Sequence, residues 1–129
     1  MPRILYIEDE PDIAELVRRW LEEDDEHQVT HARSGEAGLK LAAEERPDLI
    51  LLDINLGPLT IDGLEVNRRL KADERMRSIP VIALTAHAQR VEHRERFLAE
   101  GFVEHVSKPF DYDGLLFHVT AHLPKGGES

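Results

Sequence analysis

The sequence predicts an α/β fold in which one parallel sheet is covered by helices on both faces. The run Leu49-Ile50-Leu51-Leu52 contains four aliphatic residues without polar alternation, which is typical of a strand buried on both faces. Strand-like and helical segments alternate five times along the chain. This order favours a parallel sheet, because each new parallel strand needs a crossover connection, which is usually a helix.

The first predicted strand, residues 4–7, is apolar and ends at the acidic run 8–10. Pro11 then opens a helix, because proline fits the first helical turn. Apolar residues recur in this helix at the spacing of one face, so we expect this face, with Trp20, to pack against the core. The face consists of Ile13, Leu16, Val17, Trp20 and Leu21.

The segment from residue 27 to residue 53 contains two more predicted strands. Residues 27–32 have a weaker apolar pattern, which indicates a strand at an edge of the sheet. Ser34 is a good N-cap for a helix that continues through about Glu45. Pro47 stops that helix, and the central strand that follows ends at Asp53.

The second half of the chain continues the alternation. A helix follows Asp62-Gly63 and reaches about residue 72, with Val66 and Leu70 facing inward. The remaining elements are a strand at 80–85, a helix from about 90 to 100 that Gly101 ends, a strand at 102–106, and a helix from about 112 to 123. The last helix is expected to bury Leu115, Leu116, Val119 and Leu123.

Composition limits the class of protein. Residues 1–123 form one predicted domain, and residues 124–129 are expected to be a flexible tail. The 26 acidic and 16 basic residues give a net charge of -10, which argues against a nucleic-acid surface and against binding to anionic membranes. The absence of cysteine excludes disulfides and a cysteine nucleophile. No signal peptide or apolar run of roughly 20 residues is present, so we expect a cytoplasmic protein.

Side chains that can bind a ligand or take part in a reaction stand at the carboxyl ends of four predicted strands. Glu8 and Asp9 follow the first strand, Asp53 ends the third, Thr85 ends the fourth and Lys108 follows the fifth. Because the carboxyl ends of parallel strands share one edge, we expect these side chains to converge on one pocket.

The predicted pocket favours phosphoryl chemistry. Three carboxylates in one place repel one another, and Lys108 supplies only one positive charge. A few hard oxygen ligands suit Mg²⁺, which also shares ligands with phosphate oxygens. A carboxylate can attack phosphorus, and phosphoryl transfer mainly needs positioning and charge neutralisation. The residue set therefore suits Mg²⁺ and allows an aspartyl phosphate to form.

The chain resembles the receiver domain of two-component response regulators. The resemblance covers about residues 3–123 and lies in five motifs, each at the end of the expected strand or start of the expected helix. The motifs are Ile7-Glu8-Asp9-Glu10, Leu52-Asp53, Asp62-Gly63, Leu84-Thr85-Ala86 and Val106-Ser107-Lys108-Pro109-Phe110. The resemblance implies a flavodoxin-like, doubly wound (βα)5 fold with strand order 2-1-3-4-5.

The resemblance also implies roles for individual residues. Asp53 would be the phospho-acceptor. Mg²⁺ would bind the carboxylates of Asp9 and Asp53 and the backbone carbonyl of Asn55, while Glu8 would act mostly through metal-bound water.

Two further groups would act on the phosphoryl group itself. Lys108 would hold one phosphoryl oxygen, and Thr85 would bond another and shift on phosphorylation. The side chains two positions past the acceptor and two past the threonine, Asn55 and His87, would tune the phosphoryl lifetime.

Partners follow from the same resemblance. The phosphoryl group would come from a sensor histidine kinase or a histidine phosphotransfer protein, and self-catalysed hydrolysis would remove it. The chain would thus be a switch and not an enzyme that turns over a substrate. A downstream protein would bind the surface formed by residues 90–100, 102–106 and 112–123.

Two positions depart from the family pattern. The family usually has an aromatic switch residue three positions before the lysine, where this chain has His105. The loop Leu56–Ile61 beside the predicted metal site is longer than usual, and either changes partner choice or lifetime or is a neutral insertion.

Other histidines have simpler interpretations. His118 and His122 have the i, i+4 spacing of metal ligands, but no third ligand is evident, so we do not predict a site there. His27, His31 and His93 are expected to be exposed to solvent.

Three alternatives to a stand-alone receiver remain open. The first is a receiver that is part of a hybrid kinase or larger regulator; Met1 directly before the first strand favours the stand-alone form. The second is a degenerate binding module that is not phosphorylated. The third is a phosphohydrolase with an aspartate nucleophile, which usually has a second aspartate where this chain has Asn55.

Overall fold

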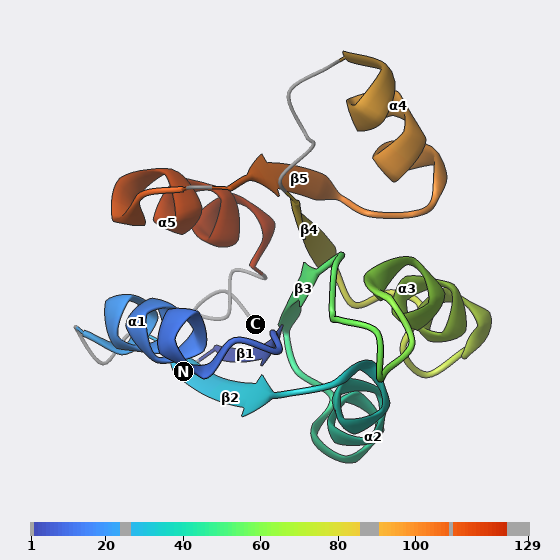
Figure 1. Ribbon diagram of the computed structural model, residues 1–129, viewed down its shortest axis with the longest axis horizontal. Helices are drawn as coiled ribbons and strands as arrows, with labels where there is room; N and C mark the ends of the chain where they lie inside the picture. Colours follow the sequence, from blue (N-terminus) through green and yellow to red (C-terminus); the bar gives the residue numbers. More distant parts are fainter. Residues whose placement is uncertain (1, 24–26, 86–90, 109, 124–129) are drawn as a thin grey trace.

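The computed structural model is described for residues 2–23, 27–85, 91–108 and 110–123, and it contains a five-stranded parallel sheet in the order β2-β1-β3-β4-β5 (Figure 1). The strands are β1 (Arg3–Ile7), β2 (Gln28–Ala32), β3 (Leu49–Asp53), β4 (Val81–Thr85) and β5 (Glu104–Ser107). The helices are α1 (Pro11–Glu22), α2 (Gly35–Glu45), α3 (Gly63–Ala72), α4 (Val91–Ala99) and α5 (Tyr112–His122). The predicted fold class and strand order are confirmed.

Helices cover both faces of the sheet and create two apolar cores. α1 and α5 pack on one face, where Tyr6, Leu51 and Leu84 are among the buried residues (Figure 1). α2, α3 and α4 lie on the other face, where Ile50 and Leu52 are buried. Adjacent residues of β3 therefore enter opposite cores, which explains why its sequence is apolar without alternation.

Side-chain caps fix the starts of three helices. Ser34 Oγ accepts a hydrogen bond from the N–H of Ala37 at 3.1 Å, which confirms the predicted cap of α2. Asp62 and Asp111 cap α3 and α5 in the same way. Gly101, with φ of +100°, follows α4 in the left-handed conformation that ends many helices.

The predicted boundaries of β5 and the predicted face of α1 need correction. β5 begins at Glu104, and the buried Phe102 packs edge-on against Phe97 of α4 with ring centres 5.7 Å apart. Phe102 is thus a core residue that precedes the strand and contacts α4. In α1 the buried positions are Ala14, Val17 and Leu21, whereas Leu16 is 48% exposed and Trp20 is only partly buried.

Two of the histidines that we expected in solvent are less exposed than predicted. His27 is 8% exposed, and its Nδ1 lies 2.8 Å from the carbonyl oxygen of Leu21. His31 is half-buried, with Nε2 2.7 Å from the carbonyl oxygen of Glu8. Each ring gains a backbone partner, which offsets the cost of burying a polar group. The side chain of His93 lies outside the described residues.

The last helix buries two of its four predicted core residues, Leu115 and Val119, while Leu116 and Leu123 are partly buried. His118 contacts Glu104 through Nδ1 and Oε2 at 3.7 Å. Among the residues that the structure describes, no helix is long and apolar enough to cross a membrane.

Candidate functional site

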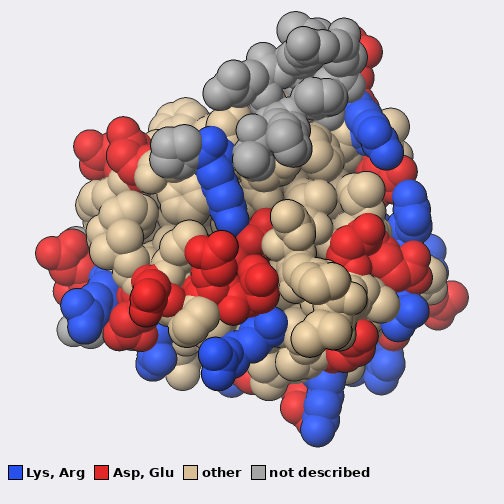
Figure 2. Space-filling view, viewed as in Figure 1, with Lys and Arg blue, Asp and Glu red and all other residues tan. Residues whose placement is uncertain are grey.

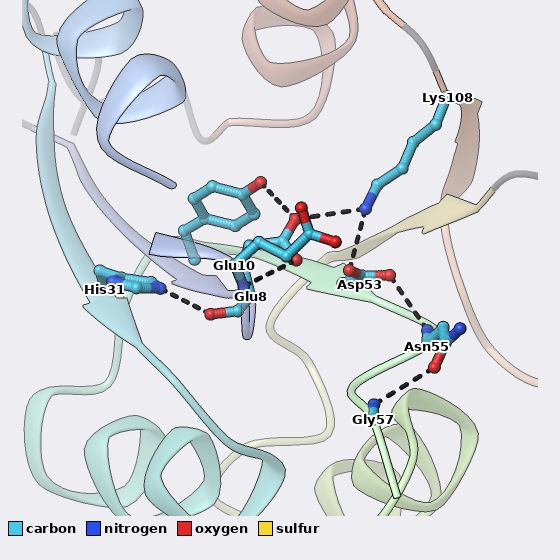
Figure 3. A network of polar contacts seen from close by, with 8 residues as sticks. Glu8, Glu10, His31, Asp53, Asn55, Gly57 and Lys108 are labelled. Atoms are coloured by element: carbon cyan, nitrogen blue, oxygen red, sulfur yellow. Dashed lines mark hydrogen bonds and ion pairs between the residues drawn. The ribbon is translucent and has the colours of Figure 1, made fainter. Parts of the chain in front are cut away.

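The carboxyl ends of β1, β3 and β5 bring together an acidic pair and a lysine. Lys108 Nζ lies 2.9 Å from Asp53 Oδ2 and 3.2 Å from Glu8 Oε1 (Figure 3). These residues are far apart in the sequence, and each directly ends or follows its strand. Strand topology therefore places one cation between two carboxylates.

Glu8 is fully buried and is held from several directions. The Tyr6 hydroxyl donates to Glu8 Oε1 at 2.9 Å, so this oxygen is shared between Tyr6 and Lys108. The backbone N–H of Glu10 lies 3.4 Å from Oε2 (Figure 3). His31 on the edge strand β2 reaches the Glu8 carbonyl, which ties β2 to the residue that carries the buried carboxyl.

Burial and charge change the protonation of this network. Burial, followed by the hydrogen bond and charge of Asp53, raises the pKa of Glu8 from 4.5 to about 8, although Lys108 and Tyr6 act in the opposite direction. Burial alone would lower the pKa of Lys108, but Asp53 and Glu8 outweigh it and raise that pKa. Burial and the charge of Glu8 likewise raise the pKa of Tyr6. Lys108 therefore does not offset the effects of burial and of Asp53, and the pKa of Glu8 stays above its ordinary value.

Three carboxylates of the site are spaced as metal ligands. Glu8, Asp9 and Asp53 each offer one oxygen, and these oxygens lie within 4.8 Å of one another. Figure 2 shows acidic side chains gathered near the middle of the viewed face, below a basic side chain. Hard oxygen donors fit Mg²⁺, and a divalent cation would neutralise the negative charge that these three carboxylates bring together. The donor set therefore fits this metal.

The turn after β3 shapes the acceptor side of the site. The N–H of Asn55 donates to Asp53 Oδ1 at 3.0 Å, and the Asn55 side chain accepts from Gly57 N–H at 3.2 Å (Figure 3). Gly63, the first residue of α3, is buried against this turn. A Cβ at Gly63 would lie 2.6 Å from the carbonyl oxygen of Asp53, so only glycine fits here.

The β4 side of the site contains Thr85 and His105. Thr85 is 6% exposed, and its carbonyl accepts the N–H of Lys108 at 2.9 Å, which fixes the lysine backbone to the end of β4. His105 is half-buried, with both ring nitrogens buried and its ring 5.8 Å from that of Phe97. The predicted modulator His87 lies outside the described residues.

Comparison with known proteins agrees with this arrangement. The family model of the response regulator receiver domain matches residues 4–120. The polar-differentiation response regulator DivK of Brucella anthropi is 36% identical, over 95% of this chain and 98% of DivK. The chain belongs to the response regulator receiver family.

Other relatives extend the comparison. The DNA-binding dual master transcriptional regulator RpaA of Synechocystis sp. is 41% identical over 95% of this receiver, which spans about half of RpaA, 49% of its length. The crystal structure of the Vibrio cholerae chemotaxis protein CheY4 superimposes with a TM-score of 0.84 at 26% identity, covering 95% of this receiver and 99% of CheY4.

Sequence reasoning missed two residues that touch this receiver site. The sequence pattern places Tyr6 in an apolar strand and predicts a solvent-exposed side chain for His31. One signal was available for Tyr6: residues two apart in a strand project to the same face, which places Tyr6 beside Glu8. The contact of His31 depends on how β2 pairs with β1, which the sequence pattern alone does not give.

Proposed function

We propose that this receiver accepts a phosphoryl group on Asp53 in a reaction that depends on Mg²⁺. The observation that carries the proposal is the contact of Lys108 Nζ with Asp53 Oδ2 at 2.9 Å, beside three carboxylate oxygens with metal-ligand spacing. Asp53 offers the nucleophile, and Lys108 offers a charge that can turn to a phosphoryl oxygen.

The groups around Asp53 have distinct tasks in this proposal. A carboxylate oxygen of Asp53 attacks the phosphorus of a phosphohistidine, the P–N bond breaks, and the leaving imidazole takes a proton from solvent. Asp9, Asp53 and the backbone carbonyl of Asn55 would hold Mg²⁺, and Glu8 would act through water. When bound, the ion neutralises charge on the transferring group.

The remaining roles concern the state after transfer. Lys108 holds one phosphoryl oxygen, and Thr85 bonds another and shifts on phosphorylation. Asn55 and His87 tune the lifetime, and His105 takes the position of the switch residue. Water then hydrolyses the aspartyl phosphate, so the receiver resets itself and does not turn over a separate substrate.

We further propose that residues 1–123 work as a cytoplasmic stand-alone receiver. The similarity to DivK over 98% of that protein supports a single-domain role. The donor is a sensor histidine kinase or a phosphotransfer protein, and the output is protein binding at the α4, β5 and α5 surface. Residues 124–129 are a tail in this proposal and lie outside the described residues.

One observation favours a second role, that of a receiver within a larger regulator. The similarity to RpaA covers 49% of that protein, so the same domain occurs there with additional sequence. The length of the native open reading frame decides between the two roles.

Intact mass after incubation with a small acyl-phosphate donor tests the proposal. We expect a gain of one phosphoryl group with Mg²⁺, no gain in its absence, and no gain in Asp53→Asn. Asp48→Asn is the matched control, because Asp48 stands at the amino end of β3, where it accepts the N–H of Arg3 at 2.8 Å. Phosphorylation of Asp53→Asn, or none of the folded wild type, would contradict the proposal.

The output surface needs its own test. Capture of partners by phosphorylated and unphosphorylated receiver should differ, because phosphorylation is expected to change the surface through Thr85. Identical capture by the two forms would count against phosphorylation-dependent binding.

A further inference from the structure

The loop between β3 and α3 consists of residues 54–62, and its first half is fixed beside the proposed metal ligands Asp9 and Asp53. The N–H of Asn55 donates to Asp53, and Leu56 is 3% exposed. Gly57 has φ of +90°, and its Cα lies close enough to Asp9 that an added Cβ would be 3.4 Å from Asp9 Oδ2. The first half of the loop therefore forms one wall of the acidic cluster.

The second half of the loop is fixed to a different part of the molecule, the start of α2. Thr60 Oγ1 accepts a hydrogen bond from the N–H of Gly35 at 2.9 Å and donates one to the carboxylate of Glu36. The same carboxylate accepts from the N–H of Ile61 at 3.4 Å. The hydroxyl of Thr60 is the main reason that the pKa of Glu36 lies below its ordinary value, so Glu36 accepts these bonds as a carboxylate.

The packing under this contact is close. A Cβ at Gly35 would lie 2.6 Å from Cγ1 of Ile61 and 3.0 Å from its carbonyl oxygen. The first turn of α2 thus meets the loop backbone directly, and glycine is needed for the approach. Between the two fixed ends, Leu59 is 98% exposed. The loop is a strap held at both ends, and not a segment that is free beyond the site.

We propose that Thr60 is a positioning residue, which bridges Gly35 and Glu36 and so holds the β3–α3 loop against Asp9 and Asp53, raising the affinity of the site for Mg²⁺. The inference rests on the proposed function, because it assigns a task to a loop beside the proposed metal site. Thr60 does not touch the metal or the phosphoryl group in this proposal.

The physical reason is the entropy of the loop. A longer loop has more conformations, and only those that place the backbone at residues 55–57 beside the carboxylates bind the ion well. The apparent dissociation constant equals the intrinsic one divided by the population of the binding conformation. The bonds of Thr60 keep this population high before the ion arrives.

Thr60→Val tests the inference, because valine keeps the β-branched shape and removes the hydroxyl. Loss of one or two such bonds should weaken Mg²⁺ binding about threefold to tenfold, whereas Thr60→Ser should stay within about twofold of wild type. Mg²⁺ affinity is measured by amide chemical shifts during titration with magnesium chloride. Thr30→Val is the matched control, because the Thr30 hydroxyl also donates to a glutamate, Glu45, at 3.2 Å, and it should leave the affinity unchanged.

A second variant and a second measurement separate positioning from loss of fold. Glu36→Gln keeps the Thr60–Gly35 bond and replaces one acceptor oxygen by a donor, so its effect should be intermediate. Hydrogen exchange should become faster at the Gly35 and Ile61 amides in Thr60→Val, while thermal unfolding remains cooperative.

The outcomes are distinct. Unchanged Mg²⁺ affinity in folded Thr60→Val would overturn the positioning role, as would equal losses in the valine and serine variants. If the wild type itself binds no Mg²⁺, the proposed function fails, and the strap fails with it. If the wild type binds Mg²⁺ and gains a phosphoryl group, failure of the Thr60 variants concerns the strap alone.

Discussion

The central strand β3 and the edge strand β5 both contribute to the site, but they hold their side chains very differently. Every residue of β3 is buried, and the Asp53 side chain is 6% exposed. β5 has one buried residue, and Lys108 after it has a side chain that is 24% exposed. The carboxylate is therefore fixed by packing on both faces of the sheet, whereas the lysine has room to change partners.

This difference suits the reaction that we propose for the site. An acceptor carboxylate must keep one position, because phosphoryl transfer depends on alignment. In the proposed reaction Lys108 turns from Glu8 to a phosphoryl oxygen, and the Tyr6 hydroxyl offers Glu8 a second donor. A rigid centre and a less buried edge are thus combined in one site.

The largest expected effect comes from breaking the rigid centre. Leu51→Ala removes a fully buried side chain of β3 and should lower the free energy of unfolding by about 2–5 kcal/mol. Val29→Ala on the edge strand β2 should cost about 1.6 kcal/mol for its two methyl groups. Urea unfolding measures both. Equal losses of unfolding free energy in the two variants would contradict a larger contribution of β3 than of the edge strand β2.

The second prediction concerns the proton on Glu8. Its pKa is raised to about 8 from 4.5, so the folded, metal-free receiver binds a proton that the unfolded chain has lost. The corresponding stability is fully present below about pH 4.5 and is lost as the pH rises through about 8. Urea unfolding in the presence of a chelator should show this slope, and Glu8→Gln should reduce it.

Mg²⁺ should reverse the dependence of folding stability on pH, because the ion favours the carboxylate form of Glu8 over the carboxylic acid. Binding of Mg²⁺ below pH 8 should therefore release a proton, which calorimetry in buffers of different ionisation enthalpy measures. Proton release of the same size in Glu8→Gln would assign the proton to another group.

A smaller effect is expected at the edge strand β2. His31→Phe keeps a ring beside Tyr6, with ring centres 6.0 Å apart in the wild type, and removes the bond to the Glu8 carbonyl. One such bond contributes about 1 kcal/mol to the free energy of unfolding. Chemical unfolding measures the loss, and a loss as large as that of Leu51→Ala would mean that β2 is not the more tolerant edge.

The smallest change in stability is expected at His105 on β5. His105→Phe keeps a ring against Phe97 and should change the free energy of unfolding by less than about 1 kcal/mol. If His105 takes the switch position, the aromatic variant should still alter the response of partner binding to phosphorylation. No difference from wild type in either measurement would remove His105 from the switch.

The central part of the fold could be predicted because its signals are local. The strand Leu49–Asp53 has the predicted bounds, since an apolar run stands between a helix stop and a loop. The cap at Ser34 could be predicted because its hydrogen bond to the N–H of Ala37 lies within one helical turn. Strand-end placement also anticipated the meeting of Glu8, Asp53 and Lys108, because parallel topology alone brings these ends together.

The sequence-based predictions were wrong or incomplete where contacts between distant residues determine burial. Phe102 is typical of a strand in its residue type, but it precedes β5 and packs against Phe97 of α4. His27 is a polar residue type, which predicts exposure. It is buried because the carbonyl of Leu21, near the end of α1, gives its ring a hydrogen-bond partner. The contacts of Thr60 with Gly35 and Glu36 join the β3–α3 loop to the start of α2, and the sequence shows only that this loop is long.

Gly63 has a consequence for how mutational data on this receiver would be interpreted. Its missing side chain leaves the space that the Asp53 carbonyl and the Ile54 Cα occupy, since a Cβ there would lie 2.6 and 2.7 Å from these atoms. In a saturation screen that selects for signalling, Gly63 would thus tolerate as little as an active-site residue, although it has no functional group. Gly63 is therefore essential to this site because it has no side chain.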